Sequence, residues 1–393
     1  MSWYYYLAAI PVFAVIVLIH ELGHFITARW ADIRVEEFGI GFPPRAFGIK
    51  RGETLYSINW LPIGGFVRMT GETGDGVTGQ AAATGGRATG ASTVDAAPTS
   101  DTGAIGGPAD PRSFAAKPAW RRIVVLLAGV TMNMLLAIVL LGAADVVGKI
   151  DYQPYIGSVV AGSPAQQIGL QVGDDILSVN GKPIKFYGDL IVALTAATQN
   201  AAPSARTVPV VLVIQRAGVA QPISLTANIL AHPGKDQARL GVGGSDSHPI
   251  ITRVPIWQLP QVGVHEVGTL VSAIFGTFGQ IATGQLAVSQ AFTGPVGIVQ
   301  VTGQAASAIP QSGWYFILYL TGFLSVSLAV VNALPIPALD GGRVLLILVE
   351  IVRRGKRLAP EREGMINLAG MAVLLCFVLF ITFFDFSRIF TGN

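Results

Sequence analysis

The sequence predicts an α-helical polytopic membrane protein with about four transmembrane helices, a membrane-associated β-hairpin and an inserted extracytoplasmic domain that is α+β or β-rich. Composition is the first observation behind this prediction. Hydrophobic residues make up 51% of the 393-residue chain, charged residues only 12%, and the mean hydropathy is +0.56. A soluble domain carries about twice that share of charges. The second observation is a set of uncharged segments long enough to cross a bilayer.

Four apolar segments form the predicted spans. The first has no charged residue between Trp3 and Ile19 and continues to Arg29. A cleaved signal peptide is the alternative, but it needs a basic start, and no Lys or Arg precedes Arg29. The other three spans are expected at 123–147, 314–331 and 366–384.

Positive charges predict the orientation of these spans. Lys and Arg lie at both ends of the segment between the first two spans, and five more lie at 353–362. Such segments face the cytoplasm, so the N-terminus and residues 149–312 are expected outside. We therefore expect a multi-pass protein of the cell inner (plasma) membrane, with the lipid bilayer as a partner. A net charge of +3 without a basic stripe predicts no nucleic-acid partner.

Local composition divides the chain further. Residues 71–119 are rich in Gly, Ala and Thr, which predicts a flexible cytoplasmic linker. Residues 264–291 are mildly apolar and predict an amphipathic helix near the outer face, with a fifth span as the alternative. The expected order is a first span at 1–29, a hairpin region at 30–70, the linker at 71–119, a second span at 120–148, the inserted domain at 149–232, an extracytoplasmic linker with the amphipathic helix at 233–313, a third span at 314–342, a cytoplasmic segment at 343–365, and a fourth span with the tail at 366–393.

The inserted domain has strand-like pieces at 156–160, 176–179, 208–214 and 223–227. Between them, the phrase from Ser163 to Gly181 resembles the core of bacterial protease-associated PDZ domains, with a short helix from Ser163, a turn at Gly173 and an Asn180-Gly181 turn. PDZ domains bind an extended peptide by strand addition. The usual carboxylate-binding loop is not evident at 155–157, so a purely steric role is the alternative.

The first predicted span contains His20-Glu21-Leu22-Gly23-His24, an H-E-x-x-H motif. On a helix the two His share one face and can bind one Zn²⁺, while Glu21 can act as general base. Placing these side chains in an uncharged span costs several kcal/mol unless they are paired or bind a metal. The alternative is a helix end whose side chains merely reach the cytoplasmic interface. His265-Glu266 lacks a second His and is not expected to bind metal.

A catalytic zinc needs a third protein ligand, and Asp340 is the best candidate. It lies in the phrase NALPIPALDGG at 332–342, after the third span. Pro335 and Pro337 stop a continuous helix there, which predicts irregular backbone lining a cavity at membrane depth. The alternative is that Asp340 only caps a helix at 341–352.

These motifs, together with the PDZ-like insertion, resemble the site-2 protease family of intramembrane zinc metalloproteases, in particular its bacterial, PDZ-containing branch that regulates sigma factors. The resemblance implies regulated intramembrane proteolysis of membrane-anchored substrates, for example an anti-sigma factor or a signal-peptide remnant. It implies a Zn²⁺ cofactor and transmembrane protein substrates, with a peptide or substrate ectodomain at the PDZ-like domain and the active site toward the cytoplasmic side. The implied site residues are the zinc ligands His20, His24 and Asp340, the base Glu21, and the substrate-positioning residues Asn332, Gly64 and Gly65.

The sequence argues against two other classes of function. A non-catalytic PDZ-containing membrane scaffold would need no general base beside a metal, and Glu21 argues against it. A transporter would be expected to carry inverted repeats with matched broken helices, and the sequence shows no such repeat.

Overall fold

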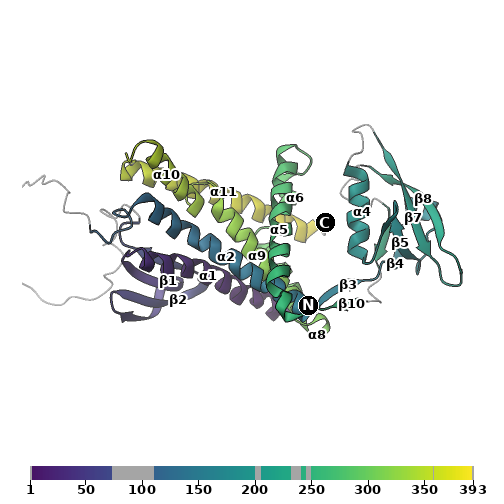
Figure 1. The fold of residues 1–393 in the computed structure, drawn as a ribbon, viewed down its shortest axis with the longest axis horizontal. Coiled ribbons are helices and arrows are strands. Elements are labelled where there is room, and N and C mark those ends of the chain that lie inside the picture. The colour runs from purple at the N-terminus through teal and green to yellow at the C-terminus, as the bar shows by residue number, and fades with distance from the viewer. Residues whose placement is uncertain are drawn as a thin grey trace, which may run out of the picture. The chain divides into compact units, whose positions relative to one another are not determined.

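The computed structural model describes residues 2–72, 110–199, 205–231, 240–244, 249–356 and 358–391. The chain separates into two compact units (Figure 1). We call Met1–Ala143 with Trp257–Asn393 the helical unit, and Ala144–Ile256 the inserted unit. Most of the predicted flexible linker, residues 73–109, lies outside the described residues.

Four long helices of the helical unit coincide with the four predicted spans. Each is apolar over most of its length, as a helix surrounded by hydrocarbon must be. They are α1 (Ala9–Trp30, preceded by the 3-10 helix η1, Trp3–Ala8), α2 (Ala119–Gly148), α9 (Tyr315–Ala333) and α11 (Pro360–Thr391).

A further helix, α5 (Leu259–Ala282), raises the number of candidate spans. Within the described residues, five helices are long and apolar enough to cross a membrane, so the prediction of about four is one too low by this measure. Figure 1 shows α5 running across the ends of α2 and α9, not alongside them. The crossing is close, because a Cβ on Gly263 would overlap the carbonyl oxygen of Ile138.

Short helices connect the long ones. They are α6 (Val288–Ala291), α7 (Pro295–Ser307), α8 (Ile309–Ser312) and α10 (Asp340–Val352). The start of α7 is held by the last helix, because the buried Asp385 carboxylate accepts hydrogen bonds from the backbone N–H groups of Gly294 at 3.1 Å and Gly297 at 2.8 Å. A carboxylate at a helix N-terminus satisfies donors that have no partner within the helix.

The predicted hairpin region forms two long strands, β1 (Val35–Arg51) and β2 (Thr54–Met69). The hairpin is confirmed, its turn lies at 51–54, and the Pro-Ile-Gly-Gly phrase at 62–65 falls inside β2. The first part of β1 pairs on both sides: Glu37 lies opposite Leu55 and Arg68. Within the described residues, the segment 65–69 pairs only with β1, so its other side is a free strand edge.

The end of the predicted linker is ordered, which corrects its boundary at 119. Phe114 and Lys117 are buried, and Lys117 donates to Asp32 at 3.1 Å. Arg112 forms ion pairs with Asp32 and Glu53. These contacts hold the segment against the end of α1 and the turn of the hairpin. Composition alone did not indicate them.

The inserted unit contains a four-stranded antiparallel sheet in the order β6-β5-β7-β8, and two strand pairs, β4 with β9 and β3 with β10. All four predicted strands are present, and Ser163 caps α3 as expected by accepting from the Gln166 N–H. The predicted bounds 149–232 are too narrow, and α4 was not predicted. The elements are β3 (Lys149–Tyr152), β4 (Ile156–Val159), α3 (Pro164–Gln167), β5 (Asp175–Val179), β6 (Lys182–Pro183), α4 (Tyr187–Gln199), β7 (Thr207–Gln215), β8 (Ile223–Leu230), β9 (Val242–Gly244) and β10 (Pro249–Thr252).

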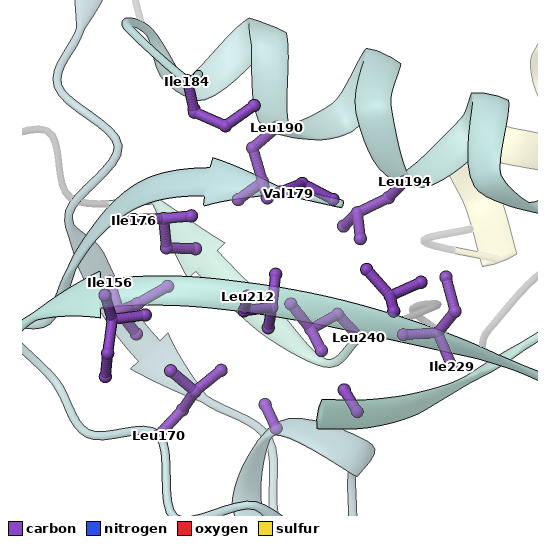
Figure 2. Close-up of a cluster of buried hydrophobic side chains, with 14 residues drawn as sticks. Ile156, Leu170, Ile176, Val179, Ile184, Leu190, Leu194, Leu212, Ile229 and Leu240 are labelled. Atoms are coloured by element: carbon purple, nitrogen blue, oxygen red, sulfur yellow. The ribbon is translucent and has the colours of Figure 1, made fainter. Parts of the chain in front are cut away.

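The core of the inserted unit lies between α4 and the sheet. Figure 2 shows Leu190 and Leu194 on α4 pointing toward Val179 and Leu212 on the strands. Along β7 every second residue is buried, ending at Ile214, as expected for a strand with one face in a core. This pattern explains why the strands were predictable.

The inserted unit also contains a buried ion pair. Asp174 is 1% exposed and accepts from Arg216 Nε and Nη2, both at 2.7 Å, and from the Gln171 N–H at 2.9 Å. Burial alone would raise the pKa of Asp174, but these hydrogen bonds outweigh it and lower the pKa below its usual range.

Replacing Arg216 with Met should therefore destabilise the inserted unit, because the buried carboxylate would lose its cation. We expect the amides of β5 and β7 in the full-length chain to lose about tenfold in hydrogen-exchange protection at pH 7. A carboxyl with a lowered folded-state pKa stabilises above its ordinary pKa and loses that contribution as pH falls through the lowered value. The difference between wild type and Arg216→Met should thus shrink in strong acid, and equal protection at pH 7 would contradict the assignment.

Candidate active site

His20 and His24 lie on the buried face of α1. They are four residues apart, so their side chains lie one turn apart on the same face, and each is 6% exposed. Gly23 allows α2 to approach this face, because a Cβ there would lie 2.5 Å from the carbonyl oxygen of Ala128. The two imidazole rings are therefore buried between α1 and α2.

Asp340 reaches these rings from the break between α9 and α10. Its Oδ2 lies 3.1 Å from His20 Nε2 and 3.3 Å from His24 Nε2. Leu339 occupies the N-cap position of α10, and Asp340 is the first helical residue. The alternative role of Asp340 as a helix cap is therefore wrong. The turn requires glycine, because a Cβ on Gly341 would overlap the carbonyl oxygens of Ala333 and Leu334.

The three side chains converge on one point. His20 Nε2 and His24 Nε2 are 3.2 Å apart, close to their distances from Asp340 Oδ2. Ligand atoms 2.0–2.2 Å from a tetrahedral zinc stand about 3.3–3.6 Å apart, so the spacing suits such an ion. Within the described residues this is the one group of three or more such side chains close enough to hold a metal.

The hydrogen bonds around the rings also fit a bound cation. His24 Nδ1 lies 2.8 Å from the carbonyl oxygen of Val125, which can only accept, so Nδ1 carries a proton. In the neutral ring the lone pair then sits on Nε2, which faces the carboxylate oxygen and the other imidazole. A cation between these acceptors satisfies all three, and two His with a carboxylate form a known set of catalytic zinc ligands.

Glu21 and the third-span phrase border the same cavity, which has a volume of about 350 Å³. The edge segment of β2 forms another wall, and at Gly65 a Cβ would lie 3.6 Å from Glu21 Cγ. The residues that line the cavity include Glu21, Gly65, Phe66, Asn332, Asp340 and Arg343.

The structure thus brings together six of the seven predicted site residues. His20, Glu21, His24, Asn332, Asp340 and Gly65 all line the cavity. Gly64 is not among the lining residues; its φ is +88°, and a Cβ there would lie 2.6 Å from the Phe42 ring. Gly64 therefore shapes the hairpin. His265, which is not expected to bind metal, lies on α5 and is not one of the three clustered side chains.

Two residues of α2 were missed by sequence reasoning. A Cβ on Gly129 would lie 2.5 Å from His24 Nε2 and 2.7 Å from His20 Nε2, so only glycine leaves room for the rings. Four residues on, the fully buried Asn133 contacts His20 Nδ1. A polar amide in the middle of an apolar span was the signal available in the sequence.

An ion pair at the cavity rim was also missed. Arg343, one turn after Asp340 on α10, pairs with Glu72, which follows β2. Glu72 and Arg343 come from segments 271 residues apart. Their pairing links α10 to the end of the edge segment, and no sequence pattern indicated it.

Comparison with known proteins decides the family. The model of peptidase family M50 matches residues 8–377 of the chain. The chain belongs to peptidase family M50. This match covers α1, the hairpin, the inserted unit and the third-span phrase, and confirms the resemblance to the site-2 proteases.

Similar proteins match over nearly their whole length. A zinc metalloprotease homologue from Clostridium perfringens is 34% identical over 383 residues, covering 97% of this chain and 98% of the relative. The regulator of sigma-W protease RasP of Bacillus subtilis is 30% identical over 434 residues, covering 98% of each chain. The zinc metalloprotease RasP of Bacillus licheniformis is also 30% identical, covering 98% of this chain and 99% of the relative. These findings confirm an intramembrane zinc metalloprotease and do not favour the scaffold.

Gly129→Ala should weaken zinc binding by about tenfold or more, because the new methyl group would displace both imidazoles. Zinc affinity can be measured by competition with a chelator in detergent. Gly268→Ala in α5 is the matched control, since a Cβ there meets nothing within 4 Å and gains the same helix propensity. Unchanged zinc affinity in Gly129→Ala would show that the rings do not need this space.

Proposed function

We propose that His20, His24 and Asp340 hold the catalytic Zn²⁺ and that Glu21 is the general base for hydrolysis of a peptide bond within a transmembrane segment. The observation that carries this proposal is the convergence of three metal-ligating atoms, 3.1–3.3 Å apart, beside a carboxylate in a helix apolar enough to cross a membrane. A bound zinc would polarise the scissile carbonyl and lower the pKa of water.

The protein's own groups supply the remaining steps. The Glu21 carboxylate accepts a proton from the attacking water and later donates it to the leaving amine. The Asn332 side chain, at the end of α9, offers an amide to the bound chain in the same cavity. The cavity places Glu21 among the two His, Asp340 and Asn332, so proton transfer takes place between positioned groups.

The free edge of β2 is the proposed substrate-pairing site. A transmembrane helix has its carbonyls hydrogen-bonded and must unwind before cleavage. The segment 65–69 borders the cavity and has one unpaired side, so an extended stretch of substrate can recover its backbone hydrogen bonds there. Gly65 is the residue of this edge that lies beside Glu21, since a Cβ there would be 3.6 Å from Glu21 Cγ.

We place the site toward the cytoplasmic side of the cell inner membrane. His20 lies in the second half of α1, and the flanking Lys and Arg put that end inside. On the same rule the N-terminus and the inserted unit are extracytoplasmic, and α5, which crosses the other helices, lies along the outer face. Cleavage there would release a cytosolic fragment of a membrane-anchored regulator, in keeping with the sigma-factor role in the name of the Bacillus subtilis relative.

We further propose that the inserted unit is PDZ-like and that the chain belongs to the PDZ-containing branch. The support is the capped helix at Ser163, the Asn180-Gly181 turn with positive φ at both residues, and a groove of about 280 Å³ between α4 and β9. Such a groove suits an extended peptide or part of a substrate ectodomain. At one end Tyr187 donates to the Val242 carbonyl at 3.2 Å and takes an acceptor that a peptide strand could use. This bond partly closes the groove, and a partly closed groove suits a domain that excludes substrates with bulky ectodomains by steric hindrance.

Zinc content and proteolysis test the site together. Purified wild type should contain about one zinc per chain and cleave a single-span substrate in liposomes. Glu21→Gln should keep the zinc and lose at least about a hundredfold in cleavage rate, because it removes only the base. Asp340→Asn should lose most of the zinc and the activity together.

The control is a Glu266→Gln variant, which changes a carboxylate on α5 and should keep both properties. Wild-type protein without zinc under chelator-free handling, or full zinc retention in Asp340→Asn, would contradict the ligand assignment.

Gly65→Val tests the pairing edge. A Cβ there lies 3.0 Å from the Gly39 carbonyl oxygen and 3.6 Å from Glu21 Cγ, so the added side chain would lie between the strand edge and Glu21. We expect kcat/KM to fall by about tenfold to a hundredfold with zinc content unchanged. Gly48→Ala, in the same hairpin, meets only the side chains of Arg45 and Leu55 and a more distant carbonyl, and is the control. Full activity of Gly65→Val would exclude substrate pairing at this edge.

A further inference from the structure

We infer that Asn133 is a positioning residue that turns its amide oxygen to His20 and holds that ring with Nε2 directed at the metal. The inference rests on the proposed zinc site and adds a residue that neither the H-E-x-x-H motif nor the third-span phrase contains. It concerns how the ring is held; Asn133 itself touches neither the metal nor the substrate.

The geometry places Asn133 directly behind the ligand. Its side-chain nitrogen lies 3.3 Å from His20 Nδ1, the ring nitrogen opposite the one that faces Asp340. The residue is fully buried, and its backbone carbonyl accepts from Ser325 Oγ at 2.8 Å, which anchors this turn of α2 to α9. The amide therefore cannot move away from the ring as a whole.

The amide has a free choice of orientation. Its Oδ1 is buried and has no hydrogen-bond partner, so rotation of the amide gives up only the contact of its nitrogen with His20 Nδ1 and replaces it with one from the oxygen. With the nitrogen toward the ring, Nδ1 of His20 accepts, and the ring proton sits on Nε2 and donates to Asp340. Rotation brings the oxygen to the ring instead.

A metal selects the rotated arrangement. A His that binds a metal through Nε2 carries its proton on Nδ1, and that N–H needs an acceptor. The amide nitrogen cannot accept, whereas Oδ1 can. His24 has the equivalent partner in the Val125 carbonyl. Both ligand rings would then be oriented by acceptors on α2, one from the backbone and one from Asn133.

Two substitutions separate this role from packing. Asn133→Leu keeps the approximate size but offers no acceptor, and should weaken zinc affinity by about tenfold to a hundredfold. Asn133→Asp offers an acceptor oxygen in either orientation and should keep affinity within a few-fold of wild type. A role in packing alone predicts the reverse order, because an apolar residue is tolerated in the core and a buried charge is costly.

The measurement is zinc affinity of the full-length protein by chelator competition, with the Co²⁺ absorption spectrum as a second readout of ligand geometry. Thr131→Ala, which removes an exposed hydroxyl of α2 that bonds only to the Leu127 carbonyl, is the control and should bind zinc normally. Thermal unfolding of the zinc-free proteins checks the fold, and if Asn133→Leu does not fold, Asn133→Ala removes the amide without bulk and should show the same loss.

Wild-type zinc affinity and an unchanged Co²⁺ spectrum in Asn133→Leu or Asn133→Ala would overturn the inference while leaving the zinc site intact. Failure of the proposed function is distinguishable, because it would appear as zinc binding that does not depend on Asp340.

Discussion

The structure depends on one constraint: three metal-ligating groups must meet inside a helical unit whose surroundings are apolar. Two come from adjacent turns of α1 and the third from a residue 320 positions later. Polar groups at membrane depth are tolerated only when they satisfy one another or a bound ion. The break after α9, the glycines of α10 and the small residues of α1 and α2 all serve to let these groups approach.

The α2 helix positions the side chains of His20 and His24. It contacts α1 closely at Gly23, leaves room for both rings at Gly129, and presents the Val125 carbonyl to His24. The opposite wall is a strand edge, whose backbone groups remain available. On the proposed function, one wall of the cavity orients the metal ligands and the other pairs with an extended chain, which is the division of roles that a protease of helical substrates requires.

Sequence patterns were sufficient where one local rule decides the structure. The apolar segments gave the spans, the four-residue spacing of His20 and His24 gave the helix face, and alternation gave the strands of the inserted unit. They failed where partners are distant in sequence. The packing of Asn133 behind His20, the pairing of Arg343 with Glu72 and the ordering around Phe114 depend on which segments meet in space.

The buried Asp385 links the two ends of the chain. It holds the start of α7, and α7 packs against the 3-10 helix that precedes α1, where a Cβ on Gly303 would lie 2.7 Å from the Tyr6 ring. The ribosome makes Asp385 long after η1 and α1. The contact of η1 with α7 can therefore be fixed by Asp385 only after translation has passed α11, well after α1 has been made.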